Sequence, residues 1–358
     1  MGKLIAAVTA GAALVAFAAG TAGAATWQVN LGQTARPPAG TPKEAFLDQF
    51  FPGKLQVNVG DKVRFTSATF HTATYLAGTP RLALFMPDPA GSKYEGINDA
   101  AGNPFWFNGL AKLIYNVPAF APVGGPTIPG KGIVTTGVLS PGPNGKPVSA
   151  TLTFAKVGAY KLVCNLHPGM EGTVVVRAKG VVVPSAATVK KVTDAQTAAA
   201  WAKAGPLAAT KTPANTVYMG VGGKTTLFAM LPKQLQVKPG TTVSFVNKSP
   251  SEPHNVVFGP KKYIEDLMKK VDLTPTAPGS PNQAPPFFPY GSEAGGAYTY
   301  DGANHGNGFL TTWLTDNQPG VPPRGLPGSV KVTFPKAGKF GYFCLLHGPD
   351  MAGTIVVK

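Results

Sequence analysis

The chain has 358 residues, with 32 Lys and Arg against 16 Asp and Glu, which gives a formal net charge of +16. Glycine (44) and proline (36) are abundant, so long helices are expected to be scarce and strands joined by turns are favoured. A positive field attracts acidic surfaces, such as an acidic protein or an anionic cell envelope. Nucleic acid is not an expected partner, because the lysines are scattered and arginines are few.

The first residues have the features of a secretory signal. Lys3 provides one positive charge, residues 4–19 are apolar and small, and Ala22-Gly23-Ala24 is an A-x-A cleavage site. We therefore predict a signal peptide over residues 1–25, cleaved near Ala24 or Ala25; an uncleaved membrane anchor is the alternative. No later stretch is apolar enough to cross a bilayer, so the mature chain is expected to have no transmembrane segment and to be secreted or periplasmic.

Two sets of short strands, separated by turns, follow the signal segment. The first set comprises residues 26–31, 55–59, 150–154, 160–163 and 172–176, and the second comprises residues 216–221, 235–237, 329–334, 340–343 and 353–357. Polar and apolar residues alternate in several of these runs, as they do in strands with one buried face. The pattern predicts an all-β chain of antiparallel sandwiches.

Landmarks of the second set follow those of the first at a nearly constant distance. Cys344 and His347 each lie 180 residues after Cys164 and His167 (344 − 164 and 347 − 167). A fixed offset over half a chain indicates a duplicated domain, because a period of 180 residues is far too long for a solenoid repeat. The sequence therefore predicts two tandem copies of one domain.

The expected boundaries are residues 26–178 for the first domain, 179–213 for a linker and 214–358 for the second domain. The linker is rich in Ala, Thr and Lys, and we expect one amphipathic helix over residues 191–204, carrying Trp201 and ended by Gly205 and Pro206.

Two short loops, one in each copy, each offer a thiolate, an imidazole and a thioether. Their residues are Cys164, His167 and Met170 in the first copy, and Cys344, His347 and Met351 in the second. Soft sulfur with nitrogen suits copper, and one Cys with two His and a weak axial Met is the blue-copper arrangement. One more imidazole follows a strand-like run in each copy, at His71 and His254, and completes two sets of four ligands.

Other interpretations of these residues remain open. Two Cys in an exported chain also suggest a disulfide, although equivalent positions of two separate domains rarely approach within bridging distance. His71 could be a hydrogen-bonded core histidine, and Met170 and Met351 could be ordinary core residues. His305, the fifth histidine, is expected on a surface loop.

Both copies resemble the cupredoxins, the superfamily of plastocyanin, amicyanin and azurin. The segments 253–255 (Pro-His-Asn) and 342–344 (Tyr-Phe-Cys) resemble plastocyanin, and the Cys-x2-His-x2-Met spacing that begins at Cys164 is similar to amicyanin. The resemblance implies a Greek-key β-sandwich in each domain and one type 1 copper in each. It also implies that His167 and His347 are the solvent-near ligands, ringed by apolar residues such as Leu166, Pro168 and Leu346, through which electrons pass.

The sequence departs from that pattern at two points. The family usually places Asn after its first His, where it ties that segment to the Cys loop; the second copy has Asn255, but the first has Thr72. Because such bonds tune a metal, the two sites are expected to differ in reduction potential. The other departure is length, since 93 and 90 residues separate the first His from the Cys (164 − 71 and 344 − 254).

Long insertions account for that extra length. They contain aromatic runs, at residues 105–107 and 287–290, and residues 261–270 are expected to form a short helix. The aromatic residues either form a surface near the copper that selects a partner or anchor the loops as small satellite cores. We favour the anchoring interpretation.

The histidine count separates the possible functions. A copper oxidase or nitrite reductase needs several further histidines, but this chain has five in total and four are assigned, so an enzyme is not expected. We predict an exported two-copper carrier that shuttles single electrons between redox partner proteins, which are expected to have acidic docking surfaces. The alternatives are copper delivery without electron shuttling, and a domain pair in which only the second site is active.

Overall fold

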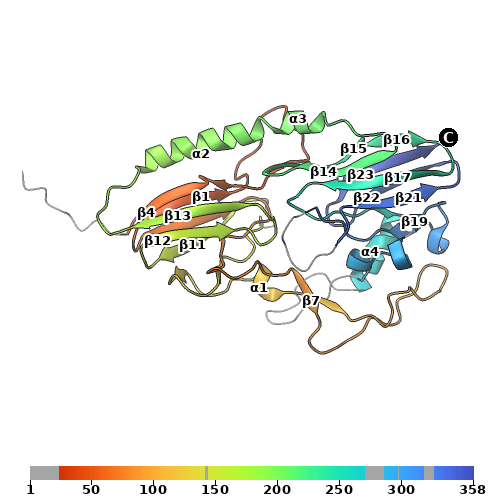
Figure 1. Ribbon diagram of the computed structural model, residues 1–358, viewed down its shortest axis with the longest axis horizontal. Helices are drawn as coiled ribbons and strands as arrows, with labels where there is room; N and C mark the ends of the chain where they lie inside the picture. Colours follow the sequence, from red (N-terminus) through yellow and green to blue (C-terminus); the bar gives the residue numbers. More distant parts are fainter. Residues whose placement is uncertain (1–23, 142–143, 271–285, 297, 318–325) are drawn as a thin grey trace, which may run out of the picture.

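The computed structural model describes residues 24–141, 144–270, 286–296, 298–317 and 326–358. The predicted signal peptide lies almost entirely outside these residues, so its cleavage remains a prediction. Within the described residues the chain is mostly β-structure, in two sandwiches that lie end to end along the long axis of the molecule (Figure 1). The predicted fold class, all-β with two tandem Greek-key sandwiches and long insertions, is confirmed.

Two five-stranded sheets form the first sandwich. In spatial order, one contains β3 (Phe50–Phe51), β1 (Thr26–Leu31), β5 (Lys62–Ser67), β11 (Val148–Phe154) and β9 (Thr127–Ile128). The other contains β10 (Val134–Thr135), β6 (Thr74–Tyr75), β12 (Gly158–Val163), β13 (Glu171–Arg177) and β4 (Lys54–Asn58). Alternate residues of β5, such as Val63 and Phe65, are fully buried between the sheets, as the period of a strand requires.

The second sandwich repeats this plan. One sheet contains β19 (Tyr298–Thr299), β21 (Ser329–Phe334), β17 (Thr241–Lys248), β14 (Thr216–Gly222), β15 (Thr225–Leu231) and β2 (Ala45–Leu47). The other contains β16 (Gln234–Val237), β23 (Gly348–Val357), β22 (Gly338–Cys344), β18 (Val257–Phe258) and β20 (Leu310–Thr311). Each of the ten strands predicted from the sequence lies within or overlaps an observed strand.

Strand β2 belongs to the first domain in sequence but to the second domain in space. It pairs antiparallel with β15, so that Leu47 lies opposite Thr225 and Ala45 opposite Leu227. Ala45 and Leu47 are buried in a small core with Trp201. The first domain therefore contributes a strand to a sheet of the second, across the predicted boundary, which the sequence pattern did not indicate.

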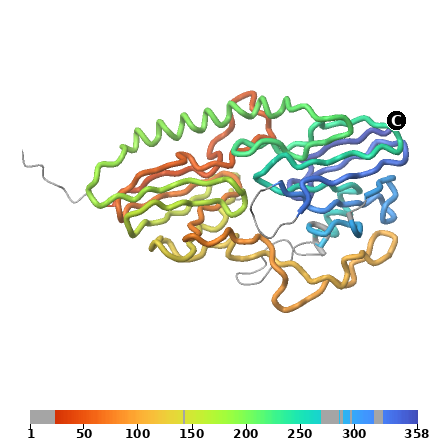
Figure 2. Tube along the Cα trace, in the orientation of Figure 1, coloured from red at the N-terminus to blue at the C-terminus, as the bar shows by residue number. Residues whose placement is uncertain are grey.

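The linker is helical over most of its length and lies along both sandwiches (Figure 2). Helix α2 (Ala186–Trp201) begins five residues before the predicted helix, because the Ser185 hydroxyl caps it by accepting a bond from the Thr188 backbone N–H at 3.2 Å. A second short helix, α3 (Ala204–Ala208), contains the Gly205-Pro206 pair that was expected to end the first. Proline is tolerated there, because the first turn of a helix does not need its N–H.

The insertions carry the remaining elements, which are β7 (Phe85–Pro87), β8 (Leu113–Tyr115), α1 (Val117–Phe120), α4 (Lys261–Lys270), α5 (Phe287–Tyr290) and the 3-10 turns η1 (Ala294–Gly296) and η2 (Asn304–Gly306). The predicted helix over residues 261–270 is confirmed. Phe105 and Phe107 of the first domain pack with Ile264, Leu267 and Phe309 of the second. The aromatic residues 105 and 107 thus anchor a satellite core, but that core joins the two domains.

Candidate metal centre

The first centre gathers three ligand atoms at one end of the first sandwich. Cys164 follows β12, and its loop is closed by hydrogen bonds from the Cys164 N–H to the Met170 carbonyl (2.9 Å) and from the Met170 N–H to the His167 carbonyl (3.1 Å). His71 is held by a bridge to Leu139, whose N–H donates to the His71 carbonyl at 2.8 Å. Cys164, His71 and His167 are all buried.

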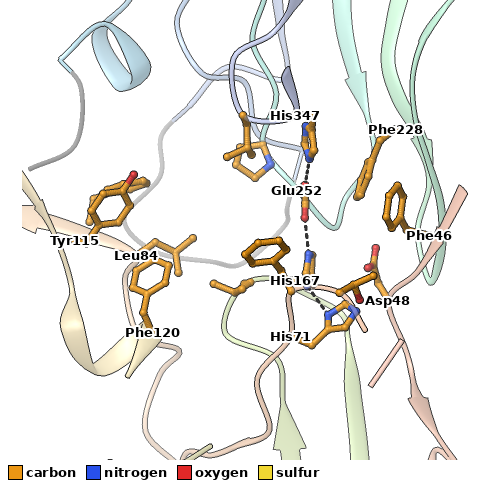
Figure 3. A pocket seen from close by; sticks show the side chains of 16 residues that line it. Phe46, Asp48, His71, Leu84, Tyr115, Phe120, His167, Phe228, Glu252 and His347 are labelled. Carbon is orange, nitrogen blue, oxygen red and sulfur yellow. Dashed lines mark hydrogen bonds and ion pairs between the residues drawn. The ribbon is translucent and has the colours of Figure 1, made fainter. Parts of the chain in front are cut away.

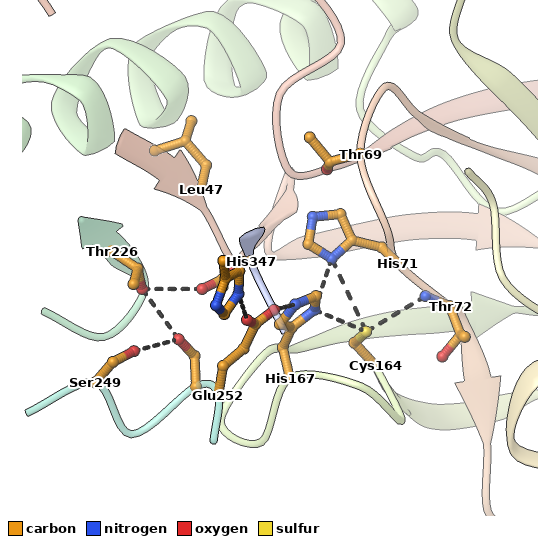
Figure 4. A network of polar contacts seen from close by, with 12 residues as sticks. Leu47, Thr69, His71, Thr72, Cys164, His167, Thr226, Ser249, Glu252 and His347 are labelled. Carbon is orange, nitrogen blue, oxygen red and sulfur yellow. Dashed lines mark hydrogen bonds and ion pairs between the residues drawn. The ribbon is translucent and has the colours of Figure 1, made fainter. Parts of the chain in front are cut away.

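Three side-chain atoms converge in this first centre (Figure 4). The Nδ1 atoms of His71 and His167 lie 2.9 Å apart, at 3.9 and 3.4 Å respectively from the Cys164 Sγ. In the sequence His71 lies 93 residues from Cys164 and His167 lies 3 residues from it, and the fold brings the three side chains together as predicted.

The second centre has the same construction. Cys344 ends β22, His254 is held by mutual backbone bonds with Thr315 (3.0 and 2.7 Å), and His254 Nδ1 lies 3.8 Å from the Cys344 Sγ. One nitrogen each of His254 and His347, with the Cys344 sulfur, all lie within 4.8 Å of one another. Both predicted Cys-His-His groups therefore form.

Met170 and Met351 are each 1% exposed and belong to the same core cluster as the cysteine of their own domain. These positions are compatible with both the axial-ligand and the core interpretation. Ligation by the thioethers remains a prediction. Cys164 and Cys344 are free thiols, so the disulfide alternative is wrong.

Thr72 and Asn255 perform the same task in the two centres. The Asn255 side-chain oxygen accepts a hydrogen bond from the Leu345 N–H at 2.9 Å, and the Thr72 hydroxyl accepts one from the Asn165 N–H, also at 2.9 Å. Each ties the first-His segment to the residue after the cysteine. The Thr72 N–H additionally donates to the Cys164 sulfur at 3.3 Å. Thr72 therefore makes the same backbone connection as Asn255, although its side chain is shorter.

Two glycines provide the space behind the upstream histidines. A Cβ at Gly32 would lie 2.4 Å from the His71 Nε2, and one at Gly220 would lie 2.7 Å from the His254 Nε2. Both glycines have a positive φ, at 64° and 67°, which other residues adopt only at a cost. Sequence reasoning did not identify them, because their role depends on an approach from a distant strand.

Neighbouring charges shift the pKa values of the cysteines and histidines in the metal-free centres. Burial raises the pKa of each thiol, but the adjacent imidazoles outweigh it, so the pKa values of Cys164 and Cys344 lie well below their usual range. Burial lowers the pKa of His347, but Glu252 and Cys344 raise it to about 10, and the pKa of His167 is likewise well above its usual value. A thiolate is the form that binds metal, and metal binding would release the imidazolium protons.

A carboxylate that sequence reasoning missed lies between the two centres. Glu252 Oε1 contacts the Nε2 of His167, and Glu252 Oε2 contacts the Nε2 of His347 (Figures 3 and 4). The only sequence signal is an acidic residue two positions before His254 in a chain that has 16 acidic residues. The partners lie 85 and 95 residues away, beyond what local spacing can indicate.

This arrangement corrects the expectation that His167 and His347 are solvent-near. The His167 side chain is 4% exposed and that of His347 is 16% exposed, and they face each other across Glu252 rather than the solvent. The neighbouring Phe70 and Leu346 are 60% and 44% exposed. They line a largely apolar cavity of about 470 Å³ that both histidines also line (Figure 3).

A second polar network crosses the domain boundary close to Glu252. The Thr226 hydroxyl donates to Asp48 of the first domain at 2.9 Å and lies 3.0 Å from the Ser251 hydroxyl. Asp48 is buried, and burial raises its pKa although His167 and His71 oppose that shift. The two domains are thus joined by polar contacts directly beside both centres.

His305 is half-buried instead of lying free on a surface loop. Its Nδ1 lies 3.1 Å from Asp99 of the first domain, and its Nε2 lies 2.8 Å from Glu293. Burial lowers its pKa, but these two carboxylates outweigh burial and raise it. The residue therefore belongs to the contact between domains.

The donor set of each centre fits copper. The His347 Nδ1 is buried with no hydrogen-bond partner among the described residues, as expected of a nitrogen reserved for a metal. In the first centre two imidazole nitrogens and one sulfur point at a common position. Thiolate with imidazole is a ligand set for copper or zinc, and the buried methionines favour copper.

No family model matches the chain, and no curated protein matches it. Similar solved structures include a mutant of amicyanin in its reduced Cu(I) form (20% identity, 42% of this chain and 89% of that chain, TM-score 0.22). They also include amicyanin from Paracoccus versutus (18%, 42% and 88%, TM-score 0.22) and a mutant plastocyanin of fern (18%, 40% and 99%, TM-score 0.21).

None of the helices in the described part of the chain is long and apolar enough to cross a membrane. With identities at or below 20% to those structures, the metal assignment rests on the residues of this chain. The chain forms two β-sandwiches of the same plan, each with a Cys-His-His group at one end, and in this it is similar to the cupredoxins.

Proposed function

We propose that the protein is a blue-copper electron carrier with one type 1 copper in each domain. The observation that carries the proposal is the formation of two Cys-His-His groups in matching places, in which every residue is buried except the half-buried His347. His71, Cys164, His167 and Met170 would hold one copper, and His254, Cys344, His347 and Met351 the other. Copper supplies one-electron chemistry, and a ligand set that is fixed by buried backbone bonds limits rearrangement between its two oxidation states.

The surrounding residues support a carrier in preference to an enzyme. Five histidines occur in the whole chain; four lie in the two groups, and His305 is bound to Asp99 and Glu293. A catalytic copper cluster would need several more. We propose that the protein is exported, on the basis of residues 1–25, and that it exchanges electrons with acidic redox proteins at the apolar surface around Phe70 and Leu346.

The test is a metal count and visible spectrum of the purified mature protein and of two single variants. Two coppers and an intense blue colour are expected for the natural protein. Cys164→Ser and Cys344→Ser should each remove one blue centre and leave the other, because each thiolate is the charge-transfer partner of its own copper. A colourless protein that binds Cu(I) loosely would instead indicate copper delivery, and a single blue centre absent only from Cys344→Ser would indicate that only the second site is active.

A further inference from the structure

The two metal centres share one carboxylate. The Glu252 side chain contacts one ligand histidine of each group, at the Nε2 of His167 and at the Nε2 of His347. Its side chain is 14% exposed, so water has little access to it.

The nitrogen by which each histidine faces its metal centre determines how the other nitrogen, Nε2, can bond to Glu252. The His167 Nδ1 faces its thiolate at 3.4 Å, and the unpartnered Nδ1 of His347 belongs to the other centre. When Nδ1 binds metal, Nε2 keeps the proton of a neutral imidazole and can only donate. A carboxylate is acceptor-only and has two oxygens, so Glu252 can satisfy both rings at once, which no neutral side chain of the same size can do.

The backbone holds Glu252 in this position. Its carbonyl accepts a hydrogen bond from the Asn247 side chain at 2.9 Å, and the same amide group donates to the Thr315 carbonyl at 3.2 Å. Thr315 in turn pairs with His254, the upstream ligand of the second centre. The residue therefore belongs to the ligand segment of one domain and reaches the ligand of the other.

Contacts that do not involve the Glu252 side chain also keep the domains in place. They are the pairing of strand β2 with β15, the Asp48–Thr226 bond and the satellite core around Phe105 and Phe107. The contacts of Glu252 with His167 and His347 are therefore not needed to join the domains. Its place between two ligand rings requires a different explanation.

We propose that Glu252 couples the two metal centres, so that an electron passes between the domains through His167, the Glu252 carboxylate and His347. This inference rests on the proposed function. In each transfer one Cu(I) becomes Cu(II) and the other Cu(II) becomes Cu(I), and no proton or further reactant is consumed. The protein would then act as a single two-electron store with an internal link, rather than as two independent carriers.

The test is the rate of electron equilibration within the molecule after pulsed, substoichiometric reduction of the fully oxidised protein. Glu252→Gln has nearly the same shape but has one acceptor oxygen, so it breaks one of the two bonds. Glu293→Gln is the matched control, because Glu293 makes the same kind of bond to His305 (2.8 Å) away from both centres. A concentration-independent fast phase is expected in the natural protein and in the control, and its loss is expected in Glu252→Gln.

A second measurement separates coupling from a merely structural role. In the reduced, diamagnetic protein labelled with 15N-histidine, two Nε2–H protons should resist solvent exchange, and one should become exchangeable in Glu252→Gln while the metal count, spectra and melting temperature are unchanged. If Glu252→Gln does not fold, Glu252→Asp keeps the charge but is too short to reach both rings, and the same loss is expected.

The outcomes also separate this inference from the proposed function. Failure of the natural protein to hold two blue coppers would overturn the carrier itself. Two blue coppers with no fast phase, or with a fast phase that survives Glu252→Gln, would overturn only the proposed coupling of the two centres through Glu252.

Discussion

At the scale of single residues, Gly32 leaves room for an imidazole that any side chain would displace. Gly32→Ala places a Cβ 2.4 Å from the His71 Nε2 and 2.6 Å from the Leu47 carbonyl oxygen. We expect the variant to lose or perturb the blue centre of the first domain and to retain that of the second, as measured by visible spectroscopy and metal count.

Gly60→Ala is the matched control for this prediction. Gly60 also has a positive φ, at 87°, but a Cβ there meets nothing within 4 Å. Both variants carry the cost of a non-glycine residue in the left-handed region, about 1–3 kcal/mol, and only Gly32→Ala adds the collision. Equal losses of stability in the two variants, with both blue centres intact, would contradict this role of Gly32.

The same scale explains which site residues could be predicted. Cys164 and His167 lie three residues apart on one loop, and their copy recurs 180 residues later, so local spacing was sufficient. The role of Glu252 depends on two domains meeting, and that of Gly32 on a strand passing behind His71. Neither contact leaves a pattern in the sequence.

At the scale of elements, the long insertion of the first domain is held to the second by η2 as well as by its aromatic residues. His305, with φ 53°, lies between Asp99 and Glu293. Its pKa is raised above the ordinary value of 6.5. A group whose pKa is raised on folding stabilises the fold below its unfolded-state pKa, and that stability is lost as pH rises through the folded-state pKa.

We therefore expect the free energy of unfolding to fall as pH rises above about 6.5. His305→Asn should remove the part of this dependence that His305 contributes without losing the backbone conformation, because Asn is one of the residues that tolerate the left-handed region. Denaturant titrations across this pH range would measure the slope for both proteins. An unchanged slope in His305→Asn would assign the dependence to other groups.

Elements with one buried face were the most predictable part of the fold. Strands such as β1 and β21 were predicted with their observed bounds because their residues pack against a single core. Strand β2 was not predicted, because an edge strand can pair with any free edge; its partner β15 lies in the other domain. Helix α2 was predicted with a late start because its cap, Ser185, precedes the amphipathic stretch.

At the scale of the whole molecule, the duplicated domains contact each other extensively and are not joined by the linker alone. Four features cross the boundary between them: strand β2, the shared aromatic core, the polar network at Asp48 and Glu252. His167 and His347 are enclosed between the domains, and the exposed apolar residues beside them are Phe70 and Leu346, where the proposed redox partner would dock. The duplication therefore produces one unit with two joined centres.

The net charge of the molecule determines how such a partner would be found. With a formal net charge of +16, long-range attraction should steer an acidic redox protein toward the surface. The second-order rate of electron transfer with an acidic partner should therefore fall steeply as salt rises, since exposed charges are screened beyond about 8–10 Å near physiological ionic strength. The visible spectra should not change, because both cysteines and three of the four ligand histidines are buried and His347 is only 16% exposed. Stopped-flow rates at increasing salt would measure the effect; a flat profile would mean that docking is chiefly apolar and that the lysines serve solubility or binding to an anionic envelope.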